Sequence, residues 1–522
     1  MRFVDYFRKG LMRGPDRLML IGEERSYTHR QVDDLSSGIA VALAASGIGD
    51  GHKAAVFTPN DPLAFVSLLG IVRAGATWAP LNVRNGFDVN SAFLAFIECD
   101  CLFYHSSLED EVEGLAAAVP SLRVFVCIDA EGRGGRLSLT EFLGRGTGNE
   151  PEVPDDPDRI VTIVSTGGTT GVPKGVQHTQ RTWEHATFAF WTTMGTEDPI
   201  IHLAAAPLSH GAGALALMML GGGATTVVLR KADPLSIIRA IETHRVTHMY
   251  LPPTVLYMML AHPDVEKFDY SSLRYFSLAA APVAPQKLRE ALRVFGPAMC
   301  QSFGQTEAPQ LCTFLSPKEV QSADPDGHSN RLSSCGRATL GVRVEVMDDD
   351  GRILSEGQRG EIVVRGGLLF AGYYNNLRQT EETLKEGWLH TGDVGYRDDD
   401  GFFYIVDRKK DMIITGGFNV YSAEVEQVVL SHHAVRDCAV VGVPDPKWGE
   451  AIKAVVELKD LQNAPRDEIE KEIIEVVRER LGGVHAPKSV EFWPELPRSP
   501  NGKILKREIR STFWVGQARA VG

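Results

Sequence analysis

The sequence has few cysteines and no paired cysteine motif. Its seven cysteines lie at positions 99, 101, 127, 300, 312, 335 and 438, and none forms a C-x-x-C pair. Zinc ribbons and disulfide frameworks need closely spaced or paired cysteines, so neither is predicted. The N-terminal stretch MRFVDYFRKGLMRGPDR also lacks the apolar core of a signal peptide. We therefore expect reduced thiols and a cytoplasmic protein.

The sequence also has fewer positively charged than negatively charged residues. Lys and Arg number 54 against 67 Asp and Glu, which gives a formal net charge of −13. A nucleic-acid-binding protein needs a clustered cationic surface, so no nucleic-acid partner is expected. The hydrophobic content of 43% excludes a largely disordered chain. At about 150 residues per domain, the 522 residues suggest roughly three domains.

No uninterrupted apolar run is long enough to cross a membrane. Residues 203–229 contain no Lys, Arg, Asp or Glu, and a spanning helix needs about 20 apolar residues. Pro207, His210 and the glycines at 221–223 divide this stretch into shorter pieces. The pattern predicts a strand, a helix over about 211–220, a glycine turn and a strand at 225–229. We expect buried core here and no membrane span.

The order of hydrophobic patterns predicts an α/β protein. Strand patterns occur at 53–58, 76–81, 101–105, 122–129, 159–165, 247–251 and 273–278, and helical patterns such as 61–75 separate most of them. This alternation is typical of layered α/β folds with largely parallel sheets. Beyond about residue 335, short strands with Asp-Gly turns predict antiparallel hairpins.

The last hundred residues read as a small α+β domain. After Tyr421 come a helix at 422–432, strands at 435–443 and 452–458, a charged helix at 466–481 and a strand at 489–493. We find no internal repeat. The charged run 407–411 is the predicted boundary between this domain and the rest of the chain.

The segment IVSTGGTTGVPKG at 163–175 is the strongest functional motif. Its glycines let the backbone approach an anion, and its threonine hydroxyls and Lys174 add donors and positive charge. It is not a P-loop, because Pro173 precedes the lysine and Gly175 follows it. The motif predicts a polyphosphate site, and the alternative is a surface loop rich in glycine and threonine.

Together with other segments, this motif resembles the adenylate-forming superfamily of acyl-CoA ligases, nonribosomal-peptide adenylation domains and luciferases. The matching segments are PLSHGAG (207–213), SLAAAPV (277–283), QSFGQTE (301–307), LHTGDVGY (389–396), DRKKDMIITGGFNVYSAEVE (407–426) and PRSPNGKILKREIR (497–510). The resemblance implies an α/β fold with a large N-terminal domain over 1–406. That domain would hold two α/β subdomains and a small β-barrel-like part. A hinge at 407–411 and a small, mobile α+β C-terminal domain over 412–522 would follow.

The resemblance also implies the reaction. It is the AMP-forming ligation of a carboxylic acid to coenzyme A through an acyl-adenylate, with ATP, Mg²⁺ and CoA. An ionised acid has a pKa of about 4–5 and needs no general base, and a thiol with a pKa of about 8.5 is partly thiolate at neutral pH. This chemistry explains why the sequence offers no Ser-His-Asp or Cys-His constellation. A nucleotide-binding regulator without catalysis is the less favoured class.

The residues expected to bind ATP and AMP follow from the matched motifs. They are Thr166, Gly167, Gly168, Thr169, Thr170, Gly171, Lys174, Ala281, Pro282, Ser302, Phe303, Gly304, Asp393 and Arg408. By resemblance, Phe303 stacks on adenine, while Asp393 takes both ribose hydroxyls with help from Arg408. The alternative for Asp393 is a hairpin-turn aspartate.

The residues expected at the reacting centre are Lys503, Thr306, Glu307 and His210. By resemblance, Glu307 is the magnesium ligand and Thr306 a phosphate contact; the alternative is a capping pair that opens a helix. Lys503 would stabilise charge on the α-phosphate in the first step. His210 would position or gate the acid, and a hydrogen-bonded core histidine is the alternative.

Three residues are expected to serve the second step, the attack of the CoA thiol. By resemblance, Lys410 is the residue about which the C-terminal domain turns. Gly416 and Gly417 would form the thin hairpin that admits the thiol, because side chains there would block its path. The alternative for the two glycines is an ordinary turn.

The acid is expected to lack an α-amino group. Amino-acid-activating relatives place an aspartate near the segment 207–213, whereas this chain has no carboxylate there. Candidate pocket residues are Phe188, Phe190, His210, Gly211, Ala212, Ala214, Leu278 and Ala280. They favour a fatty acid, since burial is worth about 0.8 kcal/mol per CH₂. A benzoate- or cinnamate-like acid stays open, although Ala279-Ala280, at a site where many relatives have two glycines, would narrow the pocket.

Two properties of the assembly are left open. No carrier segment follows residue 510, so we expect CoA as acceptor, with transfer to a separate carrier protein as the alternative. A homodimer also stays open.

Overall fold

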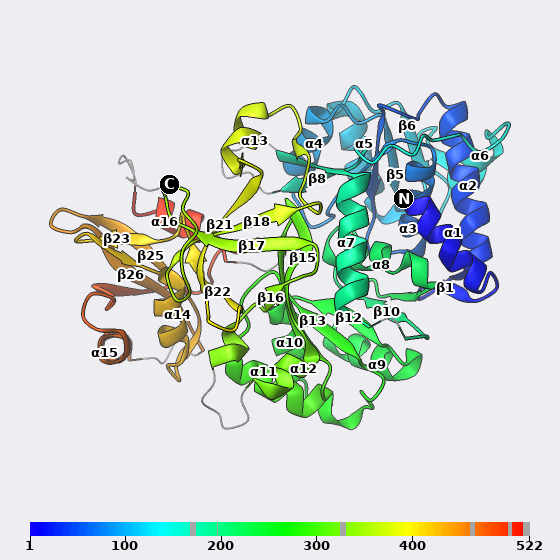
Figure 1. The fold of residues 1–522 in the computed structure, drawn as a ribbon. Helices are drawn as coiled ribbons and strands as arrows, with labels where there is room; N and C mark the ends of the chain where they lie inside the picture. Colours follow the sequence, from blue (N-terminus) through cyan, green and yellow to red (C-terminus); the bar gives the residue numbers. More distant parts are fainter. Residues whose placement is uncertain (167–173, 196, 324–329, 460–464, 500–503, 515–522) are drawn as a thin grey trace. The chain divides into compact units, whose positions relative to one another are not determined.

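A computed structural model describes residues 1–166, 174–195, 197–323, 330–459, 465–499 and 504–514. The chain forms two compact units. The first comprises Met1–Val344 and Val364–His390, and the second comprises Glu345–Val363 and Thr391–Gly522. Figure 1 colours them along the sequence. The predicted hinge at 407–411 lies inside the second unit, so its role as a hinge stays a prediction.

The first unit contains an eight-stranded sheet. Its order is β19 (Gly372–Tyr373), β9 (Lys174–Thr179), β8 (Ile160–Thr166), β4 (Thr77–Pro80), β3 (Lys53–Phe57), β5 (Cys101–Tyr104), β6 (Val124–Cys127) and β7 (Leu137–Ser138). The run from β8 to β7 is parallel, while β9 and β19 add antiparallel strands. Strands β4 and β5 are buried along their whole length, as expected for parallel strands covered on both faces.

The helices of this part of the unit are α1 (Phe3–Arg13), α2 (His29–Ala45), α3 (Pro62–Arg73), α4 (Phe87–Phe96), α5 (Glu109–Ala118) and α6 (Leu139–Gly144). Helix α3 begins with Pro62 at its first position, and the Asp61 carboxylate accepts a hydrogen bond from Leu63 N at 2.8 Å. Both features are typical of helix N-termini.

A nine-stranded sheet completes the first unit. Its order is β16 (Arg337–Ala338), β15 (Ala308–Leu315), β14 (Met299–Gln305), β13 (Tyr275–Leu278), β12 (His248–Leu251), β10 (Ile201–Ala204), β11 (Thr225–Val228), β1 (Leu18–Ile21) and β2 (Ser26–Thr28). The six central strands are parallel, and β15, β16 and β2 are antiparallel.

Helices surround this sheet. They are α7 (Gln180–Thr193), α8 (Gly211–Met218), α9 (Pro234–His244), α10 (Pro253–Leu260), α11 (Pro285–Phe295) and α12 (Pro317–Ser322). Figure 1 shows α9–α12 gathered beside β10, β12 and β13. Phe65 of α3, Phe190 of α7 and Leu217 of α8 belong to one buried cluster, so the main core joins helices far apart in the sequence.

The segment after Ala338 is built of antiparallel hairpins, as predicted. Its strands are β17 (Val342–Met347), β18 (Gly360–Gly366), β20 (Leu384–Lys385), β21 (Trp388–Arg397) and β22 (Phe403–Arg408), with helix α13 (Leu377–Thr383). Strands β21 and β22 pair antiparallel, with Asp393 opposite Arg408.

The rest of the second unit is an α+β layer. A sheet in the order β24 (Phe418–Val420), β23 (Ile413–Thr415), β26 (Gly449–Leu458) and β25 (Val435–Asp445) carries β27 (Ser489–Phe492) on β26. Helices α14 (Ser422–Leu430), α15 (Arg466–Leu481) and α16 (Lys506–Ser511) accompany it. Apolar residues of α14, α15, β25 and β26 form its core.

The expected fold class is confirmed: a large mixed α/β part with layered sheets is followed by a smaller α+β part. The stretch 203–229 also folds as predicted, with β10, α8 and β11 in sequence. Within the described ranges, no helix is long and apolar enough to cross a membrane.

Candidate active site

The phosphate motif lies between two paired strands. Thr166 ends β8 and Lys174 begins β9, and the two residues face each other in the antiparallel pair. A strand therefore follows the loop, where a P-loop would have a helix. The predicted contacts Gly167, Gly168, Thr169, Thr170 and Gly171 lie outside the described residues.

Thr306 and Glu307 form a tight turn between strands β14 and β15. The alternative of a capping pair that opens a helix is therefore wrong, because an antiparallel strand follows. The Glu307 carbonyl accepts a hydrogen bond from Phe370 N at 2.8 Å. Its carboxylate Oε1 accepts one from the Tyr373 hydroxyl at 2.7 Å.

Tyr373 also connects Glu307 to the phosphate motif. The Lys174 ammonium lies 5.6 Å from the centroid of the Tyr373 ring, within the usual range of a cation–π contact. Lys174 and Glu307, which were predicted from separate motifs, thus both contact the Tyr373 side chain. Tyr373 was not predicted, because no motif of the sequence analysis included it.

His178 holds the Thr306 end of the turn. Its Nε2 lies 2.6 Å from the Thr306 carbonyl oxygen and its Nδ1 lies 2.8 Å from the Thr162 hydroxyl. Burial lowers the pKa of His178 to about 4, so the ring is neutral at pH 7. Because a carbonyl only accepts, Nε2 carries the proton and donates, and Nδ1 accepts from Thr162. This histidine, too, was not predicted.

The other nucleotide residues of the first unit lie at strand ends. Ser302 and Phe303 are buried on β14, and the Ser302 hydroxyl lies 3.4 Å from that of Ser277. A Cβ on Gly304 would come within 2.5 Å of Gln310 N, so this position requires glycine. Ala281 and Pro282 are exposed beyond β13.

Ala280 has a backbone conformation that favours glycine. Its φ is +74°, which costs a residue with a side chain about 1 kcal/mol. Glycine adopts this conformation more readily than alanine does. Ala280 itself is exposed, and its place in an acid pocket stays a prediction.

The predicted acid-pocket residues differ widely in burial. Phe188 is 63% exposed, whereas Phe190 is fully buried, with its ring centroid 6.1 Å from that of His248. Ala212 and Leu278 are buried, and Ala214 is half-buried. The predicted pocket residues therefore do not share one environment, because some are buried and Phe188 is exposed.

His210 and Gly211 lie beside two residues that were not predicted. A Cβ on Gly211 would come within 2.6 Å of the Tyr250 ring, and its carbonyl accepts from Gln310 Nε2 at 2.7 Å. The His210 Nδ1 lies 3.0 Å from the Ser209 hydroxyl, and burial lowers the pKa of His210. A neutral, half-buried imidazole fits the predicted positioning role.

In the second unit, Asp393 and Arg408 form a close ion pair. Arg408 Nε lies 2.6 Å from Asp393 Oδ1, and Asp393 is only 3% exposed. The aspartate lies within strand β21, so the alternative of a hairpin-turn aspartate is wrong.

The predicted thiol hairpin is the turn between β23 and β24. Gly416 and Gly417 have φ of +58° and +83°, the left-handed region that favours glycine. A Cβ on Gly416 would meet the Trp448 ring at 2.7 Å. Both glycines are thus required by the turn itself, and a path for a thiol stays a prediction.

Lys503 lies outside the described residues, but the helix that follows it is firmly anchored. Lys506 Nζ lies 2.7 Å from Glu426 Oε1 and donates to Ser422 Oγ at 2.8 Å. Arg510 pairs with Asp411 and donates to the Lys410 carbonyl at 2.9 Å. Helix α16 is thus bound to α14 and to the predicted hinge segment.

Sequence comparison supplies the observation that decides the family. The family described as AMP-binding enzyme matches residues 7–374, and the family described as AMP-binding enzyme C-terminal domain matches residues 424–503. The chain belongs to the AMP-binding enzymes. The predicted membership of the adenylate-forming superfamily is confirmed.

Individual relatives of this AMP-binding enzyme cover nearly its whole length. The medium/long-chain-fatty-acid–CoA ligase FadD8 of Mycobacterium tuberculosis is 44% identical over 531 residues, which cover 97% of this chain and 89% of that protein. The feruloyl-CoA synthase of an Amycolatopsis species is 34% identical and covers 94% of each. The structure of amide bond synthetase McbA from Marinactinospora thermotolerans is 30% identical, with a TM-score of 0.87 over 98% of this chain and 100% of that one.

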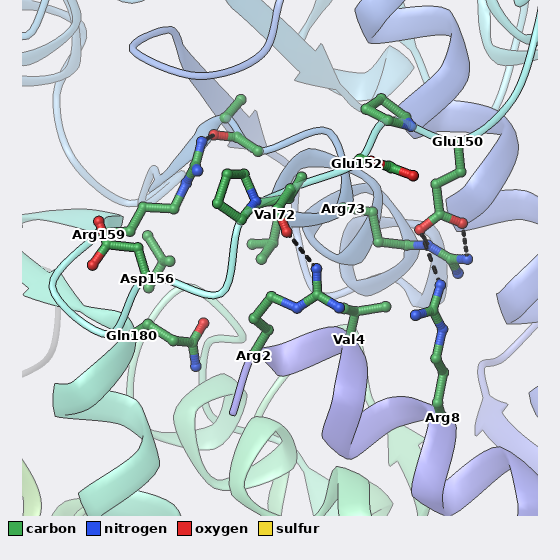
Figure 2. Close-up of a pocket in the computed structure, with 16 residues that line it drawn as sticks. Arg2, Val4, Arg8, Val72, Arg73, Glu150, Glu152, Asp156, Arg159 and Gln180 are labelled. Atoms are coloured by element: carbon green, nitrogen blue, oxygen red, sulfur yellow. Dashed lines mark hydrogen bonds and ion pairs between the residues drawn. The ribbon is translucent and has the colours of Figure 1, made fainter.

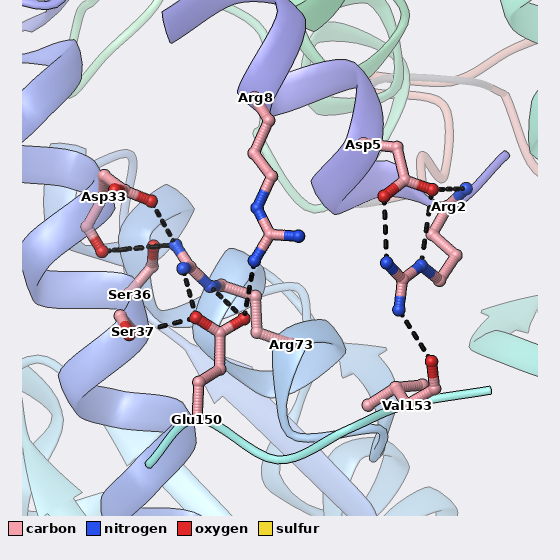
Figure 3. A network of polar contacts seen from close by, with 9 residues as sticks. All are labelled: Arg2, Asp5, Arg8, Asp33, Ser36, Ser37, Arg73, Glu150 and Val153. Carbon is pink, nitrogen blue, oxygen red and sulfur yellow. Dashed lines mark hydrogen bonds and ion pairs between the residues drawn. The ribbon is translucent and has the colours of Figure 1, made fainter. Parts of the chain in front are cut away.

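A separate cavity of about 500 Å³ lies elsewhere in the first unit of this AMP-binding enzyme (Figure 2). Arg2, Arg8, Arg73 and Arg159 line it, but acidic side chains such as Glu150 line it as well. Figure 3 shows that three of these arginines are engaged. Arg73 contacts Glu150 and Asp33, Arg8 contacts Glu150, and Arg2 contacts Asp5. Among the predicted site residues that the structure describes, none lines this cavity, and its charges largely neutralise one another.

Proposed function

We propose that this AMP-binding enzyme is an ATP- and Mg²⁺-dependent carboxylic acid–CoA ligase. In the first step, the acid and ATP give an acyl-adenylate and pyrophosphate. In the second, CoA takes the acyl group and AMP leaves. The family and the relatives support this proposal, and the contact of Lys174 and Glu307 with one tyrosine carries it, since it unites two motifs expected at the nucleotide phosphates.

The first step needs charge stabilisation rather than a base. The carboxylate of the acid is ionised at neutral pH, and its oxygen attacks the α-phosphorus of ATP as pyrophosphate leaves. We assign phosphate binding to Lys174 and Thr306, and stabilisation of charge at the α-phosphate to Lys503. His178 keeps Thr306 in place through the carbonyl that it contacts. We assign the ribose hydroxyls to Asp393 and Arg408.

Glu307 fits a magnesium ion that is shared with a nucleotide. Magnesium in such sites takes one or two carboxylates besides phosphate oxygens and water. Among the described residues no group of three His, Cys, Asp or Glu side chains could hold a metal. Glu307 offers one half-buried carboxylate, which is bonded to the tyrosine that Lys174 contacts. When bound, the ion would neutralise charge on the phosphates. We assign it to Glu307 Oε2, since Oε1 accepts from Tyr373.

The second step uses a thiol that ionises without help. A pKa of about 8.5 leaves a few per cent of the thiol as thiolate at neutral pH. We propose that the hairpin at Gly416-Gly417 borders its path and that the chain turns at Lys410 between the two steps.

The substrate that we propose is a fatty acid. No carboxylate occurs in 207–213 to pair a substrate ammonium, and Ala212 and Leu278 are apolar and buried. FadD8, named as a medium- and long-chain fatty acid ligase, supports the same choice. The similarity to a feruloyl-CoA synthase supports an aryl acid as the second candidate.

An ATP–pyrophosphate exchange assay over a panel of acids tests this proposal. Short, medium and long saturated fatty acids are compared with benzoate, a cinnamate and an amino acid. We expect exchange that depends on Mg²⁺ and rises with the length of the fatty acid. Exchange with the amino acid alone, or with no acid of the panel, would reject the assignment.

The acceptor is tested separately. AMP release that requires CoA, with acid and ATP present, identifies a CoA ligase, whereas an enzyme that only loads a carrier protein would release none. Gel filtration of the purified enzyme tests whether it forms a homodimer.

A further inference from the structure

The Glu307 carboxylate is oriented by a phenol. Tyr373 donates its hydroxyl hydrogen to Glu307 Oε1 at 2.7 Å. A phenol has an ordinary pKa of about 10, so it keeps its proton at neutral pH and acts as the donor to the carboxylate.

The position of Tyr373 is itself fixed by its neighbours. It lies in β19 opposite Val176, and its backbone N donates to Thr380 Oγ1 at 2.9 Å. Its ring meets the Phe370 ring edge-on, with 4.9 Å between centroids, and the residue is only 8% exposed. Because the Tyr373 side chain is already fixed, it loses little conformational entropy when it hydrogen-bonds Glu307. It can therefore hold the carboxylate in one orientation.

Tyr373 also reaches the phosphate motif through its ring face. Lys174 Nζ lies 5.6 Å from the ring centroid, and the strand of Tyr373 pairs with the strand that Lys174 begins. The hydroxyl and the ring face thus contact two different charged groups. Removal of the hydroxyl alone would release Glu307 while the ring stays beside Lys174.

We propose that Tyr373 is a positioning residue that fixes Glu307 Oε1, so that Oε2 is presented to the magnesium ion of the nucleotide. This inference rests on the proposed function for the role of Glu307. It adds a residue outside every motif of the sequence analysis. If Tyr373 served only in packing, its hydroxyl would not affect the Mg²⁺ dependence of the enzyme. Measuring that dependence therefore distinguishes a packing role from a positioning role.

The experiment compares Tyr373→Phe with Tyr374→Phe. The neighbouring tyrosine is a matched control, because its ring also lies 5.5 Å from a lysine ammonium, that of Lys53, and meets the Phe96 ring. We expect Tyr373→Phe to raise the Mg²⁺ concentration for half-maximal pyrophosphate exchange about tenfold, the effect of losing one hydrogen bond to a charged group. Tyr374→Phe should leave it unchanged.

A binding measurement supplies a readout apart from activity. In calorimetry, Tyr373→Phe should bind ATP with Mg²⁺ about tenfold more weakly than the unaltered enzyme. Binding of ATP in the presence of a chelator should be the same for both. Equal weakening with and without Mg²⁺ would overturn the proposal, since it would indicate a general loss of the site. Thermal unfolding of each variant verifies that it is folded.

A double-mutant cycle with Glu307→Gln shows whether Tyr373 acts through Glu307. We expect Tyr373→Phe to have no further effect on Mg²⁺ dependence once Glu307 is replaced, because coupled residues are not additive. Additive effects would contradict the proposal. The absence of acid-dependent exchange in the unaltered enzyme would instead reject the proposed function, so the two failures are distinguishable.

Discussion

The two carboxylates assigned to the nucleotide are held by donors of different charge. Glu307 accepts from the neutral phenol of Tyr373, whereas Asp393 lies 2.6 Å from the Arg408 guanidinium. An aspartate that is almost fully buried needs such a cation, because a buried unpaired charge is costly. The Arg408 guanidinium supplies that compensating charge.

Asp393→Asn tests this assignment. The amide keeps the size of the side chain but loses the negative charge and one acceptor oxygen, so we expect the KM for ATP to rise about tenfold or more. The KM for the acid should change little. Asp400→Asn, at an exposed turn of the same unit, is the control. An unchanged KM for ATP in Asp393→Asn would show that the ribose is bound elsewhere.

Lys503→Ala separates the two steps. We expect pyrophosphate exchange to slow by several orders of magnitude, because the role proposed for the ammonium is to stabilise charge that develops only in the first transition state. Thioester formation from supplied acyl-adenylate should proceed nearly as in the unaltered enzyme. Equal loss in both assays would mean that Lys503 serves both steps or the fold itself.

Residues within the matched motifs could be predicted, whereas their partners Tyr373 and His178 could not. Lys174 was found in a motif rich in glycine and threonine, whereas Glu307 and Asp393 were found through the resemblance of their segments to the adenylate-forming superfamily. Tyr373 lies 66 residues from Glu307, and His178 lies 128 residues from the Thr306 that it contacts. Strand pairing brings these partners together, and no local spacing encodes it.

At the scale of elements, one arginine joins three parts of the first unit (Figure 3). Arg73, at the end of α3, contacts Asp33 of α2 at 2.7 Å and Glu150 of the segment before β8 at 2.5 Å. Its side chain is only 4% exposed. If the guanidinium were removed, Asp33 would lose its compensating charge, and Glu150 would keep only its ion pair with Arg8 at 3.4 Å.

Arg73→Leu is therefore expected to destabilise the first unit by about 3–5 kcal/mol, the usual cost of breaking a buried ion pair. Urea unfolding monitored by circular dichroism measures it. The control is Arg30→Leu, whose pair with Asp16 is exposed, so its unfolding midpoint should not move. Equal midpoints for the two variants would contradict the role given to Arg73.

Elements were predicted better than the way they pair. The strands from Lys53–Phe57 to Tyr275–Leu278 and the helix over Gly211–Met218 follow their hydrophobic patterns closely. The turn at Thr306-Glu307 could not be decided, because a Thr-Glu pair opens helices as readily as it ends strands. Only the antiparallel return of β15 settles it.

At the scale of the whole molecule, buried histidines make stability depend on pH. Burial lowers the pKa of His29, His178 and His248 to about 4 and that of His202 to about 3, from 6.5. Between these values the unfolded chain binds more protons, so stability is lost as the pH falls through this range. Glu426, whose pKa burial raises to about 7, acts in the opposite sense between pH 7 and its unfolded value of 4.5.

We expect the free energy of unfolding to fall between about pH 6.5 and about pH 4, by up to about 1.4 kcal/mol per pH unit for each histidine. His202→Leu should reduce the slope of the free energy of unfolding against pH by the contribution of one proton, because His202 is fully buried. His433→Leu, at an exposed position of the second unit, serves as the comparison. The same slope in His202→Leu and in the unaltered enzyme would refute the role of that histidine.

The anchoring of α16 limits how this enzyme can be shortened or fused. A chain that ended before Lys506 would leave the buried carboxylate of Glu426 without its ion-pair partner. Asp411 would lose its ion pair with Arg510 as well. Ile509, which is fully buried, would also be missing from its pocket. Engineered ends and affinity tags therefore belong beyond Ser511, where α16 is complete.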